Sequence, residues 1–221
     1  MKRRTLLAAG GGAFLAAGGG LFVARPDPVS GLLPGAAHAQ QASDTLPEVA
    51  EMVLGDPDAA LEVIEYASFT CPHCASFHAN QYKDLKANYI DTGKIKFVYR
   101  EVYFDRPGLW ASMIARCPND PAFFFNMADI LYEKQREWLA SGDPATIVQE
   151  LRTLAKTVGL DDATLDACLS DGAKAESLFT WYQTNAEQDG VNSTPSFMID
   201  GTKYSNMSYD DFAETLDGKL S

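Results

Sequence analysis

The stretch LEVIEYASFTCPHC, residues 61–74, decides the fold of this chain. Its first nine residues are an apolar, β-branched run typical of a buried strand, and residues 74–90 carry apolar side chains at helical spacing. Residues 91–93 (DTG) predict a turn, and residues 95–104 (IKFVYREVYF) predict a second strand. A strand, a helix and a second strand in this length predict a βαβ unit whose two strands pair in parallel.

Two cysteines, Cys71 and Cys74, lie where the first strand gives way to the helix. A helix N-terminus stabilises a thiolate through its unpaired N–H groups and partial positive charge, and Pro72 suits the first turn because its missing donor is not needed there. A cysteine pair with a stabilised thiolate gives up its disulfide readily, so the motif predicts an oxidant. We expect Cys71 to be the more exposed, attacking sulfur and Cys74 to resolve. His73 either tunes the thiolate through a ring N–H or is an exposed spacer.

The N-terminus has the layout of a secretory signal. A basic start (KRR, residues 2–4) precedes an apolar stretch over residues 6–24, and AHA at residues 37–39 offers a cleavage site. We therefore predict a signal peptide over residues 1–39. The alternatives are an uncleaved membrane anchor, and a twin-arginine signal in place of a general secretory one. An exported protein with a cysteine pair is a candidate for disulfide handling rather than for cytosolic reduction.

The net charge of the chain limits the classes of partner that it can bind. Removal of residues 1–39 takes away four of the 18 basic and one of the 30 acidic residues, which leaves 182 residues with a net charge of −15. Such a surface argues against nucleic acid and anionic lipid as partners. The length suits one domain with a substantial core, and residues 40–52 are expected to be an export tail or linker.

In the second half of the chain the predicted secondary structure changes from strands to helices and then back to strands. Between about residues 108 and 188 no convincing strand occurs, and Pro, Gly and Ser-Gly-Asp breakers separate three helical segments: residues 121–139, 144–158 and 161–169. After Thr194-Pro195 the sequence again predicts strands, over residues 196–200 and 203–205, followed by a helix from about residue 208. We therefore predict an α/β domain made of residues 53–107 and 190–221, interrupted by a helical insertion over residues 108–189.

An exported chain with CPHC after a strand, a helical insertion and VNSTPSF (residues 191–197) opening a late strand resembles the DsbA family of thiol oxidases. The resemblance covers roughly residues 50–220 and implies an α/β, thioredoxin-like fold with an inserted all-helical domain. It also implies a cis-proline loop beside the cysteine pair, with Pro195 in that slot. The backbone groups of Thr194 are then free to pair with an extended substrate.

The resemblance also implies a function. We expect a monomeric, periplasmic thiol:disulfide oxidoreductase that donates its Cys71–Cys74 disulfide to newly secreted, reduced or unfolded proteins through a mixed disulfide. No dissociable cofactor is implied, and a membrane quinone oxidoreductase of the DsbB type is implied for reoxidation. The alternatives are a disulfide isomerase, a dedicated thiol reductase, and a non-catalytic, peptide-binding thioredoxin-like domain. An apolar patch near the motif is expected for binding unfolded substrates.

Glu65 and His78 are candidates for proton transfer. The family has an acid six residues before its first cysteine, here Glu65, and often a lysine near it on the neighbouring strand, where this chain places Tyr99. An unpaired charge in an apolar strand is costly, so Glu65 is expected to be protonated or paired, or else to face solvent at an edge. His78 follows Cys74 by one turn on an apolar helix face. It is either a core histidine or a partner of Glu65 in moving protons to and from Cys74.

The remaining cysteines, Cys117 and Cys168, both fall in the predicted insertion. An exported protein seldom leaves two thiols idle, and some DsbA-like proteins carry an extra pair in the helical domain. We therefore predict a structural disulfide, with two separate buried thiols as the alternative. A structural zinc site needs four ligands, whereas Cys71, Cys74 and His78 supply three at best, so no metal site is expected.

Overall fold

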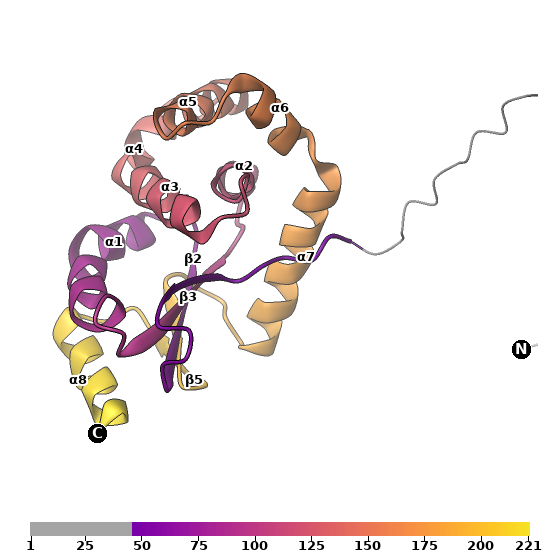
Figure 1. The fold of residues 1–221 in the computed structure, drawn as a ribbon. Helices are drawn as coiled ribbons and strands as arrows, with labels where there is room; N and C mark the ends of the chain where they lie inside the picture. Colours follow the sequence, from indigo (N-terminus) through magenta and orange to yellow (C-terminus); the bar gives the residue numbers. More distant parts are fainter. Residues whose placement is uncertain (1–45) are drawn as a thin grey trace, which may run out of the picture. The chain divides into compact units, whose positions relative to one another are not determined.

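The computed structural model describes residues 46–221, which form a five-stranded mixed sheet with helices on both faces (Figure 1). The strands are β1 (Met52–Gly55), β2 (Leu61–Ala67), β3 (Ile95–Glu101), β4 (Ser196–Ile199) and β5 (Thr202–Ser205). They are ordered β1-β3-β2-β4-β5, with β2 and β3 parallel and the other neighbours antiparallel. The parallel pair confirms the predicted βαβ unit.

Helix α1 (Pro72–Leu85) connects β2 to β3 and continues into a short π-helical turn, Lys86–Ile90. Together with α8 (Tyr209–Leu220) it covers one face of the sheet, while α7 (Gly172–Gln188) covers the other (Figure 1). Because side chains alternate along a strand, Val63 of β2 packs in the core on the α1 side and Ile64 packs against the α7 side. Burial on both faces explains the near-continuous apolar run that identified β2.

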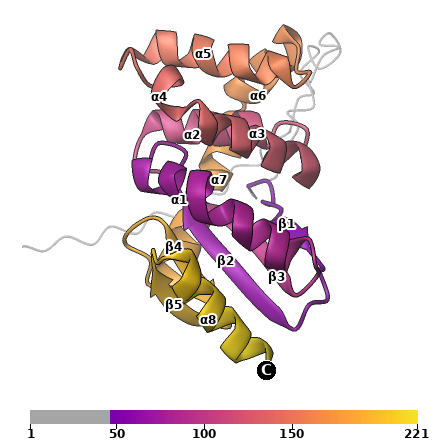
Figure 2. The same ribbon diagram turned by 90° about the vertical axis from the view of Figure 1, so that its left-hand side faces the viewer.

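Five helices between β3 and α7 form the insertion, which stacks above the sheet in Figure 2. They are α2 (Arg106–Ala115), α3 (Pro121–Glu133), α4 (Gln135–Trp138), α5 (Pro144–Thr157) and α6 (Asp162–Ser170). Four of them begin at an aspartate whose side chain accepts a backbone N–H of the first turn: Asp105, Asp120, Asp143 and Asp161. In three of these helices a proline occupies one of the first two positions, where the lost donor costs nothing.

Several boundaries differ from the predicted ones. The second strand ends at Glu101 instead of residue 104, because its partner β2 ends at Ala67, which pairs with Glu101. The helix predicted over residues 121–139 is broken at Lys134 into α3 and the short α4. Strand β1 begins at Met52, the last residue of the segment predicted to be a tail or linker.

The insertion shares its core with the sheet. Buried side chains of α3, α5 and α6 belong to the same cluster as those of β2 and β3, with Phe124, Leu151 and Leu165 on the helices and Val63 and Phe97 on the strands. The described residues accordingly form one compact unit. The division into an α/β domain and a helical insertion over residues 108–189 stays a prediction. The inserted helices do not build a core of their own, and α7, which falls within that predicted range, packs on the sheet.

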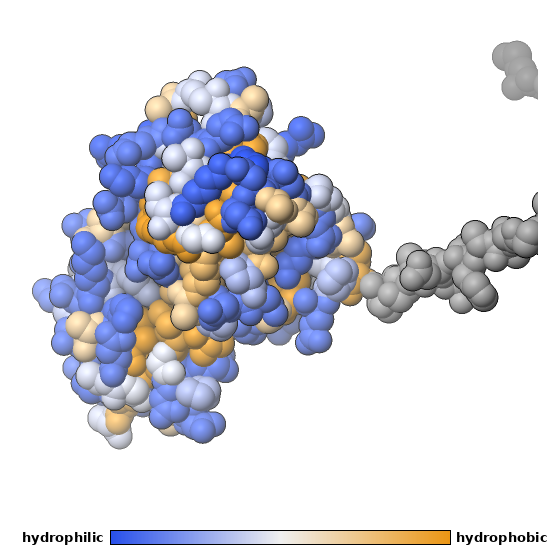
Figure 3. Space-filling view, turned by 45° about the horizontal axis from the view of Figure 1, so that its top comes forward, coloured by the Kyte–Doolittle hydropathy of each residue, from blue (hydrophilic) through white to orange (hydrophobic). Residues whose placement is uncertain are grey.

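The predicted signal peptide, residues 1–39, and residues 40–45 of the predicted tail lie outside the residues that the structure describes. Between residues 46 and 221, no helix is long and apolar enough to cross a membrane. The face shown in Figure 3 is covered mainly by hydrophilic side chains, in keeping with a chain of formal net charge −12.

Candidate active site

The CPHC motif lies at the carboxyl end of β2, the middle strand of the sheet. Cys71 is the N-cap residue of α1, with an extended backbone, and Pro72 occupies the first turn. Two backbone hydrogen bonds hold this corner: Cys71 N–H donates to the Ser68 carbonyl (3.0 Å), and Ala75 N–H donates to the Cys71 carbonyl (3.1 Å). The predicted placement of the motif between a strand and a helix is confirmed.

The two cysteines are free thiols that differ in exposure and in the direction of their pKa shifts. Cys71 is 8 % exposed, whereas Cys74 is completely buried. A hydrogen bond from the Cys74 side chain, joined by donors at Thr194 and at the backbone of Cys74 and His73, outweighs burial and lowers the pKa of Cys71 to about 5. Burial, followed by Cys71 and the Glu65 carboxylate, raises the pKa of Cys74 far above its usual range. Cys71 is thus a thiolate at neutral pH and Cys74 a thiol, and the predicted order of exposure is confirmed.

The loop before β4 brings Thr194 and Pro195 to Cys71 from 123 residues away. Their peptide bond is cis, as the resemblance implies. The Thr194 carbonyl oxygen accepts a hydrogen bond from the Cys71 thiol at 3.5 Å. The Thr194 side chain is among the groups that lower the pKa of Cys71, and its hydroxyl is buried without a hydrogen-bond partner in the described part of the chain. Thr194 therefore presents its carbonyl as an acceptor to the reactive sulfur and carries a buried hydroxyl that is free to donate.

His73 contributes to the site through its backbone. Its N–H is one of the donors that lower the pKa of Cys71, whereas its side chain is exposed. Tuning of the thiolate by the imidazole ring of His73 stays a prediction.

Glu65 and His78 form a buried pair. His78 Nε2 lies 3.1 and 3.2 Å from the two carboxylate oxygens, and Glu65 has no exposed area. The alternative of a solvent-facing Glu65 at a sheet edge is wrong, because β2 is the middle strand. Tyr99 stands opposite Glu65 on β3, so the partner of the acid comes from α1 instead of from the neighbouring strand.

Two tyrosines enclose the His78 ring. Ring centroids of Tyr132 and Tyr82 lie 4.2 and 4.4 Å from the imidazole centroid, and the Tyr132 hydroxyl shares a 2.5 Å hydrogen bond with that of Tyr99. Since Nε2 faces the carboxylate, Nδ1 is the remaining nitrogen, and it is buried without a partner among the described residues. The ring lines a pocket of about 360 Å³ beside α1 and α3, which Asp129 also lines. His78 therefore both contacts Glu65 through Nε2 and contributes to the lining of this pocket.

Two residues of the insertion reach the site with no local signal in the sequence. Tyr132 of α3 stacks on His78, and the side-chain amide of Gln135 donates to the backbone carbonyls of Phe69 and Cys71. Gln135 lies 64 residues beyond Cys71 and belongs to no motif. Only the packing of the insertion against the CPHC loop identifies these two residues.

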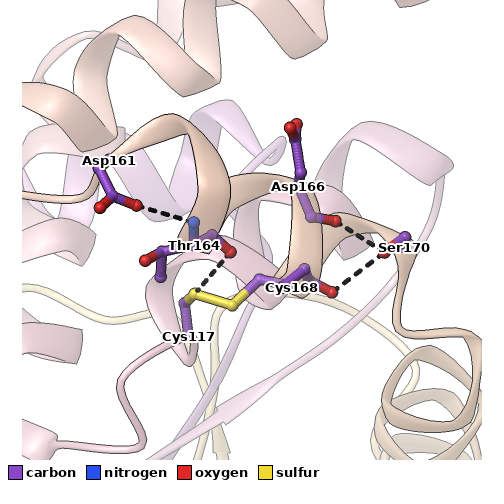
Figure 4. Close-up of a disulfide and its surroundings, with 7 residues drawn as sticks. Cys117, Asp161, Thr164, Asp166, Cys168 and Ser170 are labelled. Carbon is purple, nitrogen blue, oxygen red and sulfur yellow. Dashed lines mark hydrogen bonds between the residues drawn. A yellow bond between two sulfur atoms is a disulfide. The ribbon is translucent and has the colours of Figure 1, made fainter.

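A disulfide joins Cys117, just after α2, to Cys168 of α6 and confirms the predicted pair (Figure 4). The two Cα atoms lie 5.8 Å apart, and the cysteines are 51 residues apart in sequence. In the first turn of α6, the Thr164 N–H donates to Asp161 (Figure 4), and the Thr164 carbonyl oxygen lies 3.8 Å from Cys117 Sγ, which as a disulfide sulfur has no hydrogen to donate. The alternative of two separate thiols is therefore wrong, and the bridge ties α2 to α6 within the insertion.

Phe104 is 58 % exposed, more than any other large apolar side chain between residues 46 and 221. It precedes Asp105, the cap of α2, and Gly108 in that helix packs beside Ser68 and Thr70 of the CPHC loop. Phe104 is therefore the best candidate for the apolar contact surface expected near the motif. In the same part of the chain, no three His, Cys, Asp or Glu side chains converge as a metal site.

Comparison with known proteins places these features among related chains. Residues 48–218 match the family model described as Thioredoxin. A protein of Rickettsia bellii named as a protein-disulfide oxidoreductase is 34 % identical over 76 % of this chain and 63 % of its own length. The chain spans 60–63 % of the length of the Rickettsia relatives that it matches.

Solved structures agree with the sequence matches. The α-DsbA1 protein of Wolbachia pipientis superposes with a TM-score of 0.71 at 26 % identity, over 79 % of this chain and 94 % of that one. A protein-disulfide isomerase of Novosphingobium aromaticivorans superposes with a TM-score of 0.69 at 28 % identity, over 77 % and 97 % of the two chains. Both similarities extend over the sheet and the inserted helices.

Proposed function

The chain belongs to the thioredoxin-like DsbA family of protein-disulfide oxidoreductases, and on that premise we propose that it is an exported oxidase of reduced proteins. The observation that carries this proposal is the opposite ionisation of the two sulfurs. Cys71 has a pKa of about 5 and Cys74 has one far above its usual range. Stabilisation of the Cys71 thiolate favours the reduced pair, so the oxidised pair has a strong tendency to pass its disulfide on.

The proposed reaction consists of two thiol–disulfide exchanges. A substrate thiolate attacks Cys71 Sγ, a substrate–Cys71 disulfide forms, and Cys74 leaves and takes up a proton. A second thiolate of the substrate then attacks the substrate sulfur of this mixed disulfide, and Cys71 leaves as a thiolate. The substrate loses two electrons and gains a disulfide, and the enzyme ends as the Cys71 thiolate and the Cys74 thiol.

Two features support binding of an unfolded substrate. The Thr194 carbonyl lies 3.5 Å from Cys71 Sγ and is placed to accept a backbone N–H from a chain that crosses the sulfur. Hydrogen bonds to the main chain of a substrate do not depend on its side chains, which suits an enzyme with many substrates. Phe104 offers an exposed apolar contact for the hydrophobic segments of such chains.

Glu65 and His78 are proposed to supply the proton that Cys74 takes up. The Glu65 carboxylate is close enough to raise the pKa of Cys74, and it is held by His78 Nε2 at 3.1 Å. Nδ1 of the same ring is buried and unpaired among the described residues, and His78 lines the pocket that Asp129 also lines. A proton that passes from Glu65 to Cys74 is thus replaced through the imidazole from the pocket side.

Oxidation rate against pH tests this relay. In His78→Ala the route from the pocket to Glu65 is cut, so the rate should fall and its pH profile should change shape. Tyr82→Phe is the matched control, because it keeps an aromatic ring against His78 and leaves the Glu65 contact in place. An unchanged profile for His78→Ala would rule out the relay and leave His78 as a core residue.

Periplasmic location, a monomeric state and reoxidation by a DsbB-type quinone partner are further parts of the proposal. The Cys117–Cys168 disulfide supports an oxidising compartment, since such bonds persist outside the cytosol. Mass spectrometry of the exported protein should find a new N-terminus after residue 39, and light scattering should find one chain per particle. Retention of residues 1–39 in the membrane fraction would favour an anchor instead.

The decisive test of the oxidase is its redox equilibrium with glutathione, measured beside two activity assays. The reduction potential should lie near the oxidising values of about −120 to −180 mV, and the protein should oxidise a reduced peptide, with Cys71→Ser inactive. A potential near the thioredoxin value of about −270 mV would refute the oxidase and favour a reductase. The resemblance to the Novosphingobium isomerase makes an isomerase the second candidate. Faster refolding of a scrambled protein than oxidation of a reduced one would favour it.

A further inference from the structure

Gln135, a side chain of the helical insertion, is hydrogen-bonded to the loop between β2 and α1. Gln135 Nε2 donates to the Phe69 carbonyl and to the Cys71 carbonyl, each at 2.9 Å. Two bonds account for both hydrogens of the amide nitrogen. Gln135 is only 5 % exposed, so water does not compete for either acceptor.

The two carbonyls depend on this donor to different degrees. Phe69 lies beyond Ala67, the last residue of β2, so its carbonyl has no partner in the sheet ladder. The Cys71 carbonyl accepts one bond from Ala75 N–H at the start of α1 and a second from Gln135. Loss of the amide would leave a buried acceptor unpaired at Phe69 and would loosen the cap at Cys71.

We infer that Gln135 is a positioning residue of the active site: its amide fixes the segment from Phe69 to Cys71 and so holds the Cys71 sulfur against the first turn of α1. The backbone N–H groups of His73 and Cys74 stabilise the thiolate only while the sulfur stays within their reach. Hydrogen bonds weaken steeply with distance and angle, so a small shift of the loop is enough to reduce this stabilisation.

The short helix α4 is suited to this role because it is anchored on its other side. Trp138 is 1 % exposed, and its indole N–H donates to the Leu131 carbonyl at 2.9 Å. Gln135 also borders a pocket of about 500 Å³ between α1 and α4. The charged residues that line this pocket stay unchanged in the test below: Glu133, Arg136 and Glu137.

The test measures the pKa of Cys71 in the reduced, full-length exported protein by thiolate absorbance, together with the glutathione equilibrium. Gln135→Met keeps the side-chain volume and removes both donors. The pKa of Cys71 should rise by about one unit, a tenfold change in thiol acidity, and the equilibrium should shift three- to tenfold toward the oxidised enzyme. Gln135→Asn keeps the amide but withdraws it by one methylene, so it should behave like Gln135→Met.

Leu178→Ala, a core truncation in α7, is the control for general loss of stability. It should lower the melting temperature without moving the pKa of Cys71. An unchanged pKa in folded Gln135→Met, a shift of equal size in Leu178→Ala, or wild-type behaviour of Gln135→Asn would each overturn the inference. It rests on the proposed function only for its consequence in catalysis. A thiol pKa needs no substrate, so failure of the oxidase assay and failure of this inference are separate results.

Discussion

The low pKa of Cys71 predicts that the unfolding free energy of the reduced protein, relative to that of the oxidised protein, increases as pH rises. In the reduced protein the thiol pKa falls from 9.0 to about 5 on folding. Because the folded state lowers this pKa, the contribution is complete above the unfolded value and is lost as pH falls through about 5. The oxidised protein has no thiol at this position in either state, so it lacks the contribution.

The size of the effect follows from linkage. Each pH unit between the two pKa values is worth about 1.4 kcal/mol, and at pH 5 the folded thiol is already half ionised. The unfolding free energy of the reduced form, minus that of the oxidised form, should therefore increase by about 2 kcal/mol between pH 5 and pH 7.

Urea unfolding of both redox forms at the two pH values measures this difference directly. Other titrating groups change both forms alike and largely cancel. Reduced Cys71→Ser should show no such increase, because it has no thiolate at this position. A difference between the two forms that stays constant from pH 5 to pH 7 would refute the assignment of Cys71 as a stabilised thiolate, and with it the argument for an oxidant.

Three further predictions concern the surroundings of this sulfur. Thr194→Val removes the hydroxyl donor and keeps the carbonyl, so the thiolate pKa should rise by about one unit, since a hydrogen bond to a charged group contributes about 1.5–3 kcal/mol; an unchanged absorbance titration would contradict this. The double variant Cys117→Ala, Cys168→Ala should lose up to about 4 kcal/mol of unfolding free energy and keep the glutathione equilibrium of the active pair; identical urea midpoints would show that the bridge contributes nothing. Phe104→Ser should raise KM for a reduced unfolded protein severalfold without changing the redox equilibrium, and an equal effect of Phe179→Ser on α7 would deny Phe104 a specific role.

The sheet strands and the CPHC motif can be predicted from the sequence, because short stretches of residues are enough to determine them. A parallel strand buried on both faces leaves an uninterrupted apolar run, and β2 shows it. Parallel pairing of β2 and β3 leaves the register open, and only the resemblance to the DsbA family indicates that Tyr99 lies near Glu65, where the structure has it. The positions of the two cysteines at the start of α1 follow from the strand before them and the helical spacing after them.

The parts that sequence does not predict depend on contacts between distant segments. Gln135 is a polar residue in a helical stretch, and nothing near it in sequence indicates that it reaches the carbonyl of Phe69, 66 residues away. The buried pair of Arg116 with Glu101, whose Nη2 and Oε2 lie 2.7 Å apart, joins α2 to β3 in the same way. Since the insertion shares one core with the sheet, these contacts are fixed by packing and not by any local pattern.

The difference in pKa between the two sulfurs also determines whether the mixed disulfide returns to the starting disulfide or goes forward to the oxidised substrate. It returns to the starting disulfide when Cys74 attacks Cys71, and it goes forward when a second substrate thiol attacks. Attack requires a thiolate, and burial keeps Cys74 protonated, so the return is slow. In the forward step Cys71 is the leaving group, and a thiol with a pKa of about 5 leaves readily. A reductase needs the opposite arrangement, because its buried cysteine must attack quickly to release the reduced substrate. The same two pKa shifts that make the pair oxidising therefore also direct the mixed disulfide toward the oxidised product.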